Sequence, residues 1–283
     1  MLLSQLPVLS RVGHDRAAVH RDSPEWLAAA WVRGRALVVT PEYSTPLAEP
    51  PALALRPTEG LSGDRYFLGL ADDVPIFAVR APRDLGADRW ADLREVGAVL
   101  GDRDAGLFTT AVALARWHDR HPRCPLCGEP TELRRAGWVR RCPVDGSEHF
   151  PRTDPAVIML VHDGGDRCVL GRQETWPPGR FSILAGFVEP GESPEAAVAR
   201  EVDEEVGLAV TDVTYAGSQP WPFPSSLMLG YTARAVGDLT VVLRDHELAE
   251  AVWLSRDEIR AGAIRLPPPV SIAHRIITDW LDR

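Results

Sequence analysis

The sequence contains no lysine, so all 31 of its basic residues are arginines. A Walker-type phosphate loop and a Schiff-base mechanism both need a lysine amine, and these two kinds of chemistry are therefore excluded. The net charge of −9 at pH 7 argues against broad, non-specific binding to nucleic acid, because phosphate affinity rests on clustered cations. A local site for a phosphorylated small molecule is compatible with this charge.

Long hydrophobic runs are also missing. No segment approaches the roughly 18 apolar residues of a membrane span. The first residues, MLLSQLPVLSRVGHDR, lack the basic stretch and apolar core of a signal peptide. Cysteine is scarce, with four in 283 residues, so a disulfide framework is not expected. We therefore expect a soluble, cytoplasmic protein.

The composition changes twice along the chain, whose length exceeds that of a usual single domain. Residues 1–118 hold short extended runs and one helical run, GLFTTAVALARWHDRH. Residues 119–153 are rich in cysteine, proline, glycine and arginine, which predicts a small insert stapled by metal. Residues 154–283 begin with a hairpin similar in shape to the earlier DRYFLGLADDVPIFAVR. We predict three parts with these boundaries, the first being a relative of the third that lost its chemistry.

The segment ESPEAAVAREVDEEVGL predicts a helix of about three turns. Ser193 suits the N-cap, Pro194 suits the first helical position, and Gly207 suits the end. One stripe of the helix is apolar and is expected to face a core; it consists of Val198, Val202 and Val206.

The same helix concentrates negative charge. Glu201, Glu204 and Glu205 share one face at i, i+3 and i+4, while Asp203 points elsewhere. Each such pair of like charges is unfavourable by a few tenths of a kcal/mol, about the size of one helix-surface interaction. A hard divalent cation such as Mg²⁺ or Mn²⁺ would compensate this repulsion, because it prefers carboxylate oxygens. The alternative is a solvated acidic face on which Arg200 pairs at i+4.

The spacing of the whole segment favours the metal site. Five residues separate Gly186 from Glu192, seven more lead to Arg200, and the run REVDEEVGL follows. This pattern resembles the Nudix box, G-x5-E-x7-R-E-U-x-E-E-x-G-U with U aliphatic. The resemblance implies an α/β/α sandwich with a mixed sheet, preceded by a zinc-ribbon-like insert and a degenerate Nudix-like N-terminal α+β domain. It also implies metal-dependent hydrolysis of a nucleoside diphosphate linked to another group.

The parts of the box have expected roles. Gly186 and Gly191 are expected to let the backbone turn tightly ahead of the helix. Glu192 and Arg200 are expected to pair and so to fix the loop against the helix, while the glutamate face holds the ions.

The segment SQPWPFPSSLM follows the box. Its three prolines stiffen a loop from which Trp221 and Phe223 project, and flat ligands stack on such rings. The alternative is a rigid surface loop whose aromatic rings fill the core. After a Nudix box, this segment resembles the NAD(H) diphosphatase branch, also called NADH pyrophosphatases or the NudC type. The resemblance implies hydrolysis of NADH or NAD⁺ to nicotinamide mononucleotide and AMP, and in some members removal of NAD caps from RNA.

The resemblance also implies site residues. Glu201, Glu205 and Glu247 would be metal ligands together with the Ala185 carbonyl, and Glu204 would belong to the same cluster. Without the resemblance, Glu250 is as available as Glu247. Arg94 would reach a phosphate across a homodimer. The dinucleotide site would be lined by Phe150, Phe187, Gln219, Pro220, Trp221, Pro222, Phe223, Pro224, Ser225, Ser226 and Ala273.

The cysteines have the spacing of a zinc ribbon, although one thiolate is missing. CPLC supplies Cys124 and Cys127, and CPVD supplies Cys142, with Asp145 where the resembled family usually has cysteine. Carboxylate or imidazole completes tetrahedral Zn²⁺ sites, so Asp145 or a nearby histidine, His121 or His149, is the candidate fourth ligand. The alternative is a decayed ribbon packed around Trp138. Cys168, within RCVLGR, is expected to be a buried strand residue.

Three functions are compared. The first is a Mg²⁺- or Mn²⁺-dependent NAD(H) diphosphatase, and the second is an enzyme whose main role is to remove NAD caps from RNA. The acidic net charge favours the small molecule. The third is a noncatalytic zinc-ribbon module that senses a nucleotide. Every glutamate of the box is present, which favours an enzyme.

Overall fold

A computed structural model describes residues 5–83, 89–244 and 247–283. The chain divides into two compact units. Of the described residues, the first holds residues 5–10, 154–220 and 226–283, and the second holds residues 11–153 and 221–225. The predicted boundary after residue 118 stays a prediction, since the contacts place both of its sides in the second unit. None of the described helices is long and apolar enough to cross a membrane.

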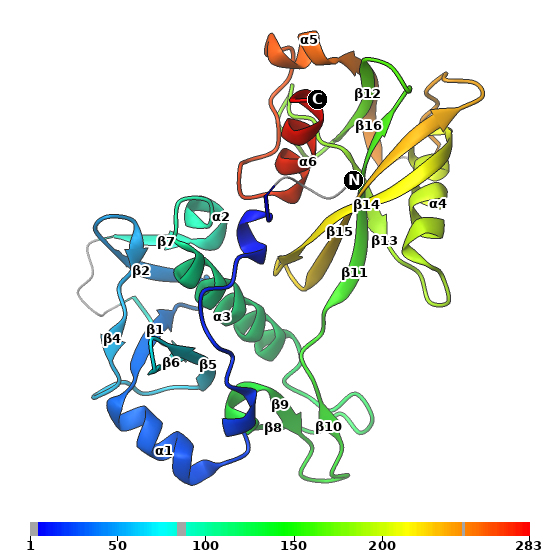
Figure 1. Ribbon diagram of the computed structural model, residues 1–283. Helices are drawn as coiled ribbons and strands as arrows, with labels where there is room; N and C mark the ends of the chain where they lie inside the picture. Colours follow the sequence, from blue (N-terminus) through cyan, green and yellow to red (C-terminus); the bar gives the residue numbers. More distant parts are fainter. Residues whose placement is uncertain (1–4, 84–88, 245–246) are drawn as a thin grey trace. The chain divides into compact units, whose positions relative to one another are not determined.

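The first unit is built on a mixed sheet of six strands (Figure 1). Its elements are β11 (Asp154–His162), β12 (Arg167–Gln173), β13 (Leu184–Phe187), α4 (Pro194–Val206), β14 (Ala209–Trp221), β15 (Ser226–Val236), β16 (Leu248–Ser255), α5 (Arg256–Arg260) and α6 (Ile272–Leu281). The strand order is β14-β15-β11-β12-β16, and β13 pairs with β11. The sheet is mixed because β11 runs parallel to β15 and antiparallel to β12 and β13.

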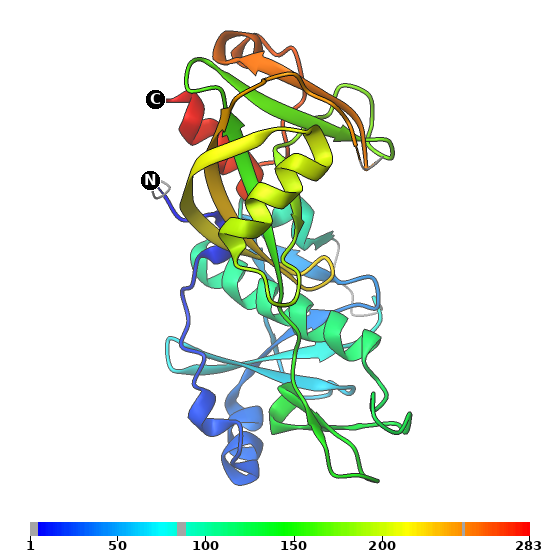
Figure 2. The same cartoon turned by 90° about the vertical axis from the view of Figure 1, so that its right-hand side faces the viewer.

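Successive residues of β11 point to opposite faces of this sheet, as the two-residue period of a strand requires. On one face Val157, Met159 and Val161 share a core cluster with the predicted valine stripe of α4. On the other face Ile158 and Leu160 share a core cluster with the apolar side of α6. Figures 1 and 2 show the two helices on opposite sides of the sheet. The predicted α/β/α sandwich is confirmed.

The second unit contains three smaller sheets. A four-stranded sheet has the order β4-β1-β6-β5, a second has β3-β2-β7, and the third, in the cysteine-rich segment, has β10-β9-β8. The elements are α1 (Pro24–Arg33), β1 (Arg35–Val39), β2 (Ser44–Ala48), β3 (Ala52–Leu53), β4 (Arg56–Pro57), β5 (Arg65–Ala71), β6 (Val74–Arg80), β7 (Trp90–Asp92), α2 (Leu93–Val96), α3 (Asp102–Arg120), β8 (Glu132–Arg134), β9 (Val139–Arg141) and β10 (Glu148–His149).

Helices cover both faces of the four-stranded sheet in this unit. Phe67 of β5 makes an edge contact with Trp26 of α1, at 5.4 Å between ring centroids. Its neighbour Tyr66 stacks on His118 of α3, with centroids 4.6 Å apart. Adjacent strand residues point to opposite faces, so α1 and α3 lie on opposite sides. This layering repeats the helix-sheet-helix order of the first unit.

His118 anchors the cysteine-rich segment to α3. Its Nε2 lies 2.8 Å from the Gly137 carbonyl oxygen, and its Nδ1 lies 2.9 Å from Nη1 of Arg140. A guanidinium only donates, so Nδ1 accepts and Nε2 carries the single proton of a neutral imidazole. Burial of the ring lowers the pKa of His118 to about 4.

Because of His118, we expect the folded protein to lose stability in acid. An unfolded histidine titrates near pH 6.5, so the unfolded chain binds the proton first and stability falls as the pH drops from there towards 4. We expect the free energy of unfolding to lose about 2 kcal/mol at pH 5 through this residue. Urea unfolding at pH 7.5 and pH 5 measures the loss, and His118→Gln, which cannot titrate, should show a loss smaller by that amount. An identical pH dependence in both proteins would contradict the assignment.

Candidate active site

Helix α4 begins and ends as its sequence predicts. The Ser193 hydroxyl accepts a hydrogen bond from the Ala196 amide at 3.2 Å, and Pro194 is the first helical residue. Gly207 ends the helix in the left-handed region, with φ of 71°. Its amide donates to the Asp203 carbonyl at 2.9 Å. Both ends of α4 are therefore set by local sequence.

Arg200 joins the loop before α4 to the helix. It donates to both carboxylate oxygens of Glu192 at 2.9 Å each, and to the Phe187 carbonyl at 2.9 Å. The predicted pairing of Glu192 and Arg200 is confirmed. The same guanidinium donates through Nη1 to Glu201 at 2.7 Å and to Glu204 at 2.8 Å. One arginine thus holds carboxylates from both the loop and the helix.

The carboxylates of α4 have different surroundings. Glu205 is only 3% exposed, whereas half of the Glu204 side chain is exposed. Burial raises the pKa of Glu201; Arg200 opposes this shift, and the nearby carboxylates of Glu204 and Glu247 add to it. Glu247, far away in sequence, therefore lies within electrostatic reach of the helix.

Two other predicted ligand positions have defined neighbours. Glu250, the rival of Glu247, lies 3.5 Å from Arg172 across the β12–β16 pair. Glu247 is one of the carboxylates that raise the pKa of Glu201, and its role as a metal ligand stays a prediction. Ala185 lies in β13, opposite Ile158 of β11. Its carbonyl as a metal ligand stays a prediction.

Glycine is required at position 186 for a different reason from the one predicted. It lies within β13 rather than in a turn, so the turn prediction is wrong for this residue. A Cβ atom at this position would lie 1.9 to 2.1 Å from the carboxylate atoms of Glu201. Glycine is needed because the carboxylate packs directly on the strand backbone. The prediction holds for Gly191, whose φ is 89°.

The proline-aromatic segment forms the end of the β14–β15 hairpin. Gln219 is fully buried, and its Nε2 donates to the Val270 carbonyl at 3.1 Å while its Oε1 accepts from the Leu9 amide at 3.5 Å. Ala273 belongs to α6, is 1% exposed and packs in the core cluster on that side of the sheet. The side chains of both residues lie in the interior, and their place in the dinucleotide site stays a prediction.

Trp221 and Phe223 meet arginines in the second unit. Their rings lie 4.8 Å apart, and the Arg94 guanidinium lies 4.2 Å from the Phe223 centroid and 5.4 Å from that of Trp221. Arg116 lies 3.9 Å over the ring of Tyr43 and 5.4 Å from Phe223. The two rings are partly exposed and do not fill a core. The sequence did not point to Arg116, which in the pattern is one polar position of a long helix.

Two aromatic side chains predicted to bind the dinucleotide are exposed. Phe187 at the end of β13 is 59% exposed, and Phe150 after β10 is 57% exposed. Large apolar side chains are normally buried, so an exposed ring beside charged residues is an available stacking surface. Phe187 belongs to the first unit and Phe150 to the second.

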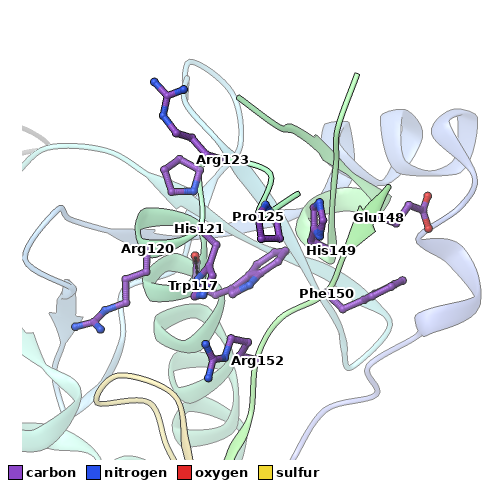
Figure 3. Close-up of a pocket in the computed structure, with 10 residues that line it drawn as sticks. Trp117, Arg120, His121, Arg123, Pro125, Glu148, His149, Phe150 and Arg152 are labelled. Atoms are coloured by element: carbon purple, nitrogen blue, oxygen red, sulfur yellow. Dashed lines mark hydrogen bonds between the residues drawn. The ribbon is translucent and has the colours of Figure 1, made fainter. Parts of the chain in front are cut away.

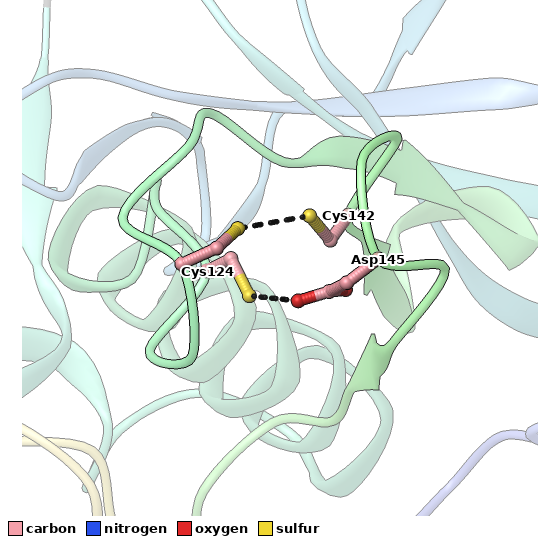
Figure 4. A group of neighbouring side chains, drawn as sticks. Cys124, Cys142 and Asp145 are labelled. Atoms are coloured by element: carbon pink, nitrogen blue, oxygen red, sulfur yellow. Dashed lines mark hydrogen bonds between the residues drawn. The ribbon is translucent and has the colours of Figure 1, made fainter.

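Three cysteines and one aspartate form a compact cluster in the second unit (Figure 4). The four ligand atoms lie within 4.8 Å of one another, and the members are Cys124, Cys127, Cys142 and Asp145. Sγ of Cys124 lies 3.3 Å from Oδ2 of Asp145, and the sulfurs of Cys127 and Cys142 are 3.5 Å apart. A tetrahedral site with zinc-to-sulfur bonds of about 2.3 Å has edges of about 3.8 Å. The donor set and spacing therefore fit Zn²⁺.

The structure places Asp145, and neither candidate histidine, with the three sulfurs. Oδ1 of Asp145 accepts from the Ser147 amide at 2.9 Å and from its hydroxyl, which turns Oδ2 towards the cysteines. Hydrogen bonds from Ser147 lower the pKa of Asp145, so the carboxylate is charged at neutral pH. Cys168 lies apart from the cluster, fully buried in β12 as predicted, and burial raises its pKa to about 12.

Comparison with known proteins shows which family this chain belongs to. A NUDIX domain model matches residues 152–281, an NADH pyrophosphatase zinc ribbon model matches residues 119–150, and a model for an NADH pyrophosphatase-like rudimentary NUDIX domain matches residues 25–117. The protein named NAD-capped RNA hydrolase NudC in Mycobacterium bovis (strain BCG / Pasteur 1173P2) is 44% identical over 98% of this chain and 96% of its own length. The chain is a Nudix hydrolase of the NADH pyrophosphatase type.

Other members of the Nudix family are more distant. The human NAD-capped RNA hydrolase NUDT12 is 40% identical over 64% of this chain and 43% of its own length. The crystal structure of a Nudix hydrolase from Nitrosomonas europaea covers 56% of this chain and 90% of its own, with 20% identity and a TM-score of 0.48. The rudimentary NUDIX match confirms that the N-terminal part is related to the catalytic part. Membership in a hydrolase family also favours an enzyme over the noncatalytic module.

Proposed function

We propose that this Nudix hydrolase cleaves the pyrophosphate bond of NADH and NAD⁺ and releases nicotinamide mononucleotide and AMP. The observation that carries the proposal is the intact carboxylate face of α4. Arg200 donates hydrogen bonds to Glu201 and Glu204 of this face, and the Glu201 carboxylate packs against Gly186 of β13. The names of the relatives, NAD-capped RNA hydrolases, point to the same dinucleotide.

The residues present suit a divalent cation. Hard ions such as Mg²⁺ and Mn²⁺ prefer oxygen donors, and Glu201, Glu205, Glu247 and the Ala185 carbonyl would hold one, with Glu204 in the same cluster. When bound, the ion would neutralise charge on the diphosphate and lower the pKa of the attacking water. Gly186 makes room for the Glu201 carboxylate against the strand, which keeps this donor in one place.

Other side chains are proposed to hold the carboxylates in place or to contact the substrate. Arg200 shares its Nη1 between Glu201 and Glu204 and so holds their carboxylates on one side of the helix. Phe187, exposed directly after Gly186, offers its ring to a base. Within the second unit, the rings of Trp221 and Phe223 lie beside the Arg94 guanidinium, and the family resemblance is the support for assigning them to the dinucleotide. No covalent nucleophile is required, because water attacks phosphorus.

A substrate comparison tests the proposal. NADH, NAD⁺, ADP-ribose, FAD and a short NAD-capped RNA are each incubated with the protein and Mn²⁺, and kcat/KM is measured for AMP or its counterpart. We expect the NAD-containing substrates to be preferred. A preference for ADP-ribose or FAD would contradict the assignment. The ratio of NAD-capped RNA to NADH decides which of these two is the main substrate.

Finer properties belong to the same proposal. We propose one structural Zn²⁺ held by Cys124, Cys127, Cys142 and Asp145, for which the geometry of the cluster is the support. A homodimer and a cytoplasmic location are proposed from the family resemblance and from the sequence, respectively. Light scattering of the purified protein tests the homodimer.

Substitution of Gly186 gives a sharp prediction for this site. In Gly186→Ala the new methyl group collides with the Glu201 carboxylate, which must move away. Displacing a catalytic group by about 1 Å costs on the order of 100-fold, so we expect kcat/KM for NADH to fall by about that factor. The displaced atoms end a flexible side chain, so the melting temperature should change little. A normal rate, or a loss of rate explained by unfolding, would contradict the assigned role of this glycine.

A further inference from the structure

Two arginine side chains lie beside the ring of Phe223 in the second unit. The Arg94 guanidinium is 4.2 Å from the centroid of this ring, and the Arg116 guanidinium is 5.4 Å from it. Arg94 belongs to α2 and Arg116 to α3, so two separate helices bring these charges to one place. The family resemblance assigns a role to Arg94 and to Phe223, but it assigns none to Arg116.

The charge of Arg116 is not balanced by the described part of the chain. Within residues 5–83, 89–244 and 247–283, neither Arg116 nor Arg94 forms a salt bridge with a carboxylate, and the buried Nε of Arg116 has no hydrogen-bond partner. Burial is the main cause that lowers the pKa of Arg116, and the positive charge of Arg94 also lowers it. A partly buried cation next to another cation is unfavourable unless an anion pairs with it. The two arginines therefore suit an anionic ligand.

Tyr43 holds the Arg116 side chain in place. Its ring centroid lies 3.9 Å from the guanidinium carbon, and its hydroxyl donates to Asp119 at 3.0 Å. Asp119 in turn pairs with Arg80 at 2.8 Å. The backbone of Tyr43 is in the left-handed region, with φ of 64°, which a tyrosine rarely adopts. Backbone strain of this kind is found mainly at functional sites, where the surrounding structure maintains it. Both the turn and the hydroxyl thus fix the ring on which Arg116 packs.

We propose that Arg116 is a further substrate-binding residue, which binds a phosphate of the dinucleotide together with Arg94. The inference rests on the proposed function, since that function supplies the ligand. Each phosphate of a dinucleotide is negatively charged, and a planar guanidinium donates paired hydrogen bonds to phosphate oxygens. The ring of Phe223, which both arginines contact, presents the flat apolar surface that a base needs. Charge and ring therefore meet at one position of the second unit.

Binding of NADH without hydrolysis tests the role of Arg116 directly. The fluorescence of NADH is titrated with the full chain at several salt concentrations, in buffer without Mg²⁺ or Mn²⁺. We expect Arg116→Gln to raise the Kd for NADH roughly tenfold at low salt, through loss of one charge-assisted contact to phosphate. The Kd of the wild type should also rise more steeply with salt than the Kd of the variant, because salt screens the lost ion pair.

Steady-state kinetics with Mn²⁺ separates substrate binding from the chemical step. Arg116→Gln should raise KM for NADH about tenfold and change kcat by less than about twofold, because the contact is made equally in the substrate complex and in the transition state. Arg116→Lys keeps the charge but lacks the planar fork, so its KM should lie between those of the wild type and Arg116→Gln. Melting temperature and zinc content show whether each variant is folded.

Two variants control for general effects. Arg33→Gln removes an exposed arginine at the end of α1 that lies 5.9 Å from the Trp26 ring centroid. The same charge and the same kind of ring contact are lost in the second unit, yet NADH should bind as it does to the wild type. Tyr43→Phe keeps the ring and removes only the hydrogen bond to Asp119, so it should raise KM by a smaller factor than Arg116→Gln does.

Several results would overturn the proposal. Equal Kd and KM in Arg116→Gln and the wild type would do so, as would an equal rise of KM in Arg33→Gln, which would reflect net charge alone. A fall in kcat at unchanged KM, or a loss of rate explained by unfolding of both Arg116 variants, would also count against a binding role. Hydrolysis of NADH that does not depend on Arg116 would overturn this inference and leave the proposed function intact. NADH that binds through Arg116 but is not hydrolysed would count against the proposed function alone.

Discussion

Glu205→Gln is expected to lower kcat/KM for NADH by about 1,000-fold, while the protein stays folded. Glu205 lies on the glutamate face of α4 and is only 3% exposed, so its carboxylate is held in the interior, where we propose that it binds the cation. The amide has the same shape but lacks the negative charge and the second hard oxygen that a divalent cation prefers. The rates are measured with Mn²⁺ in excess, and circular dichroism checks the fold.

Asp203→Asn is the matched control for this prediction. It replaces a carboxylate with an amide two residues away on the same helix, but Asp203 points outward and pairs with Arg244 at 2.6 Å. An exposed pair of this kind contributes about 0 to 1 kcal/mol, so rate and stability should both stay near wild type. Equal activity of Glu205→Gln and the wild type would contradict the assigned site. Equal loss in both variants would point to a general effect of charge.

Cys142→Ser is expected to abolish zinc binding and to unfold the cysteine-rich segment. Its three strands are only two or three residues long, so the segment lacks a core that could hold it without metal. Structural zinc sites contribute about 10 to 16 kcal/mol of apparent binding energy to small domains, and that energy is folding energy. The zinc content measured by metal analysis should fall from about one zinc per chain to a trace. Limited proteolysis should cut between residues 119 and 150.

Two further variants make the zinc prediction specific. Cys168→Ser changes a buried cysteine of β12 outside the cluster, and it should retain the zinc. Asp145→Ala should lose zinc, whereas Asp145→Cys should restore the usual four-thiolate set and bind it more tightly. Wild-type protein with far less than one zinc per chain would contradict the site. It would favour a ribbon held by packing around Trp138, whose indole donates to the Phe67 carbonyl at 2.8 Å.

Much of the catalytic unit follows from local sequence. The caps of α4, its valine stripe and its glutamate face depend on residues within one helix, where a period of 3.6 residues fixes the geometry. The Glu192–Arg200 pair lies within the same continuous motif and was also predictable. The cysteine pattern likewise predicted which side chains would meet, although only the structure chose Asp145 over the two histidines.

Long-range contacts explain what the sequence did not predict. Gln219 is bound by Leu9, 210 residues away, and by Val270, 51 residues away, so no local pattern announces its burial. Gly186 looks like a turn residue until the structure shows the Glu201 carboxylate against its Cα. A pocket lined by Trp117, Pro125 and His149 joins the end of α3 to both sides of the cysteine-rich segment (Figure 3), and those residues become neighbours only after the segment folds onto the helix.

The most direct test is the product analysis of NADH incubated with the purified protein and Mn²⁺. Hydrolysis of the pyrophosphate bond predicts AMP and reduced nicotinamide mononucleotide in equal amounts, and both should disappear with Glu205→Gln. Absence of AMP from the wild-type reaction would contradict the account. So would cleavage at another bond, with nicotinamide and an ADP-ribose product in place of the two mononucleotides.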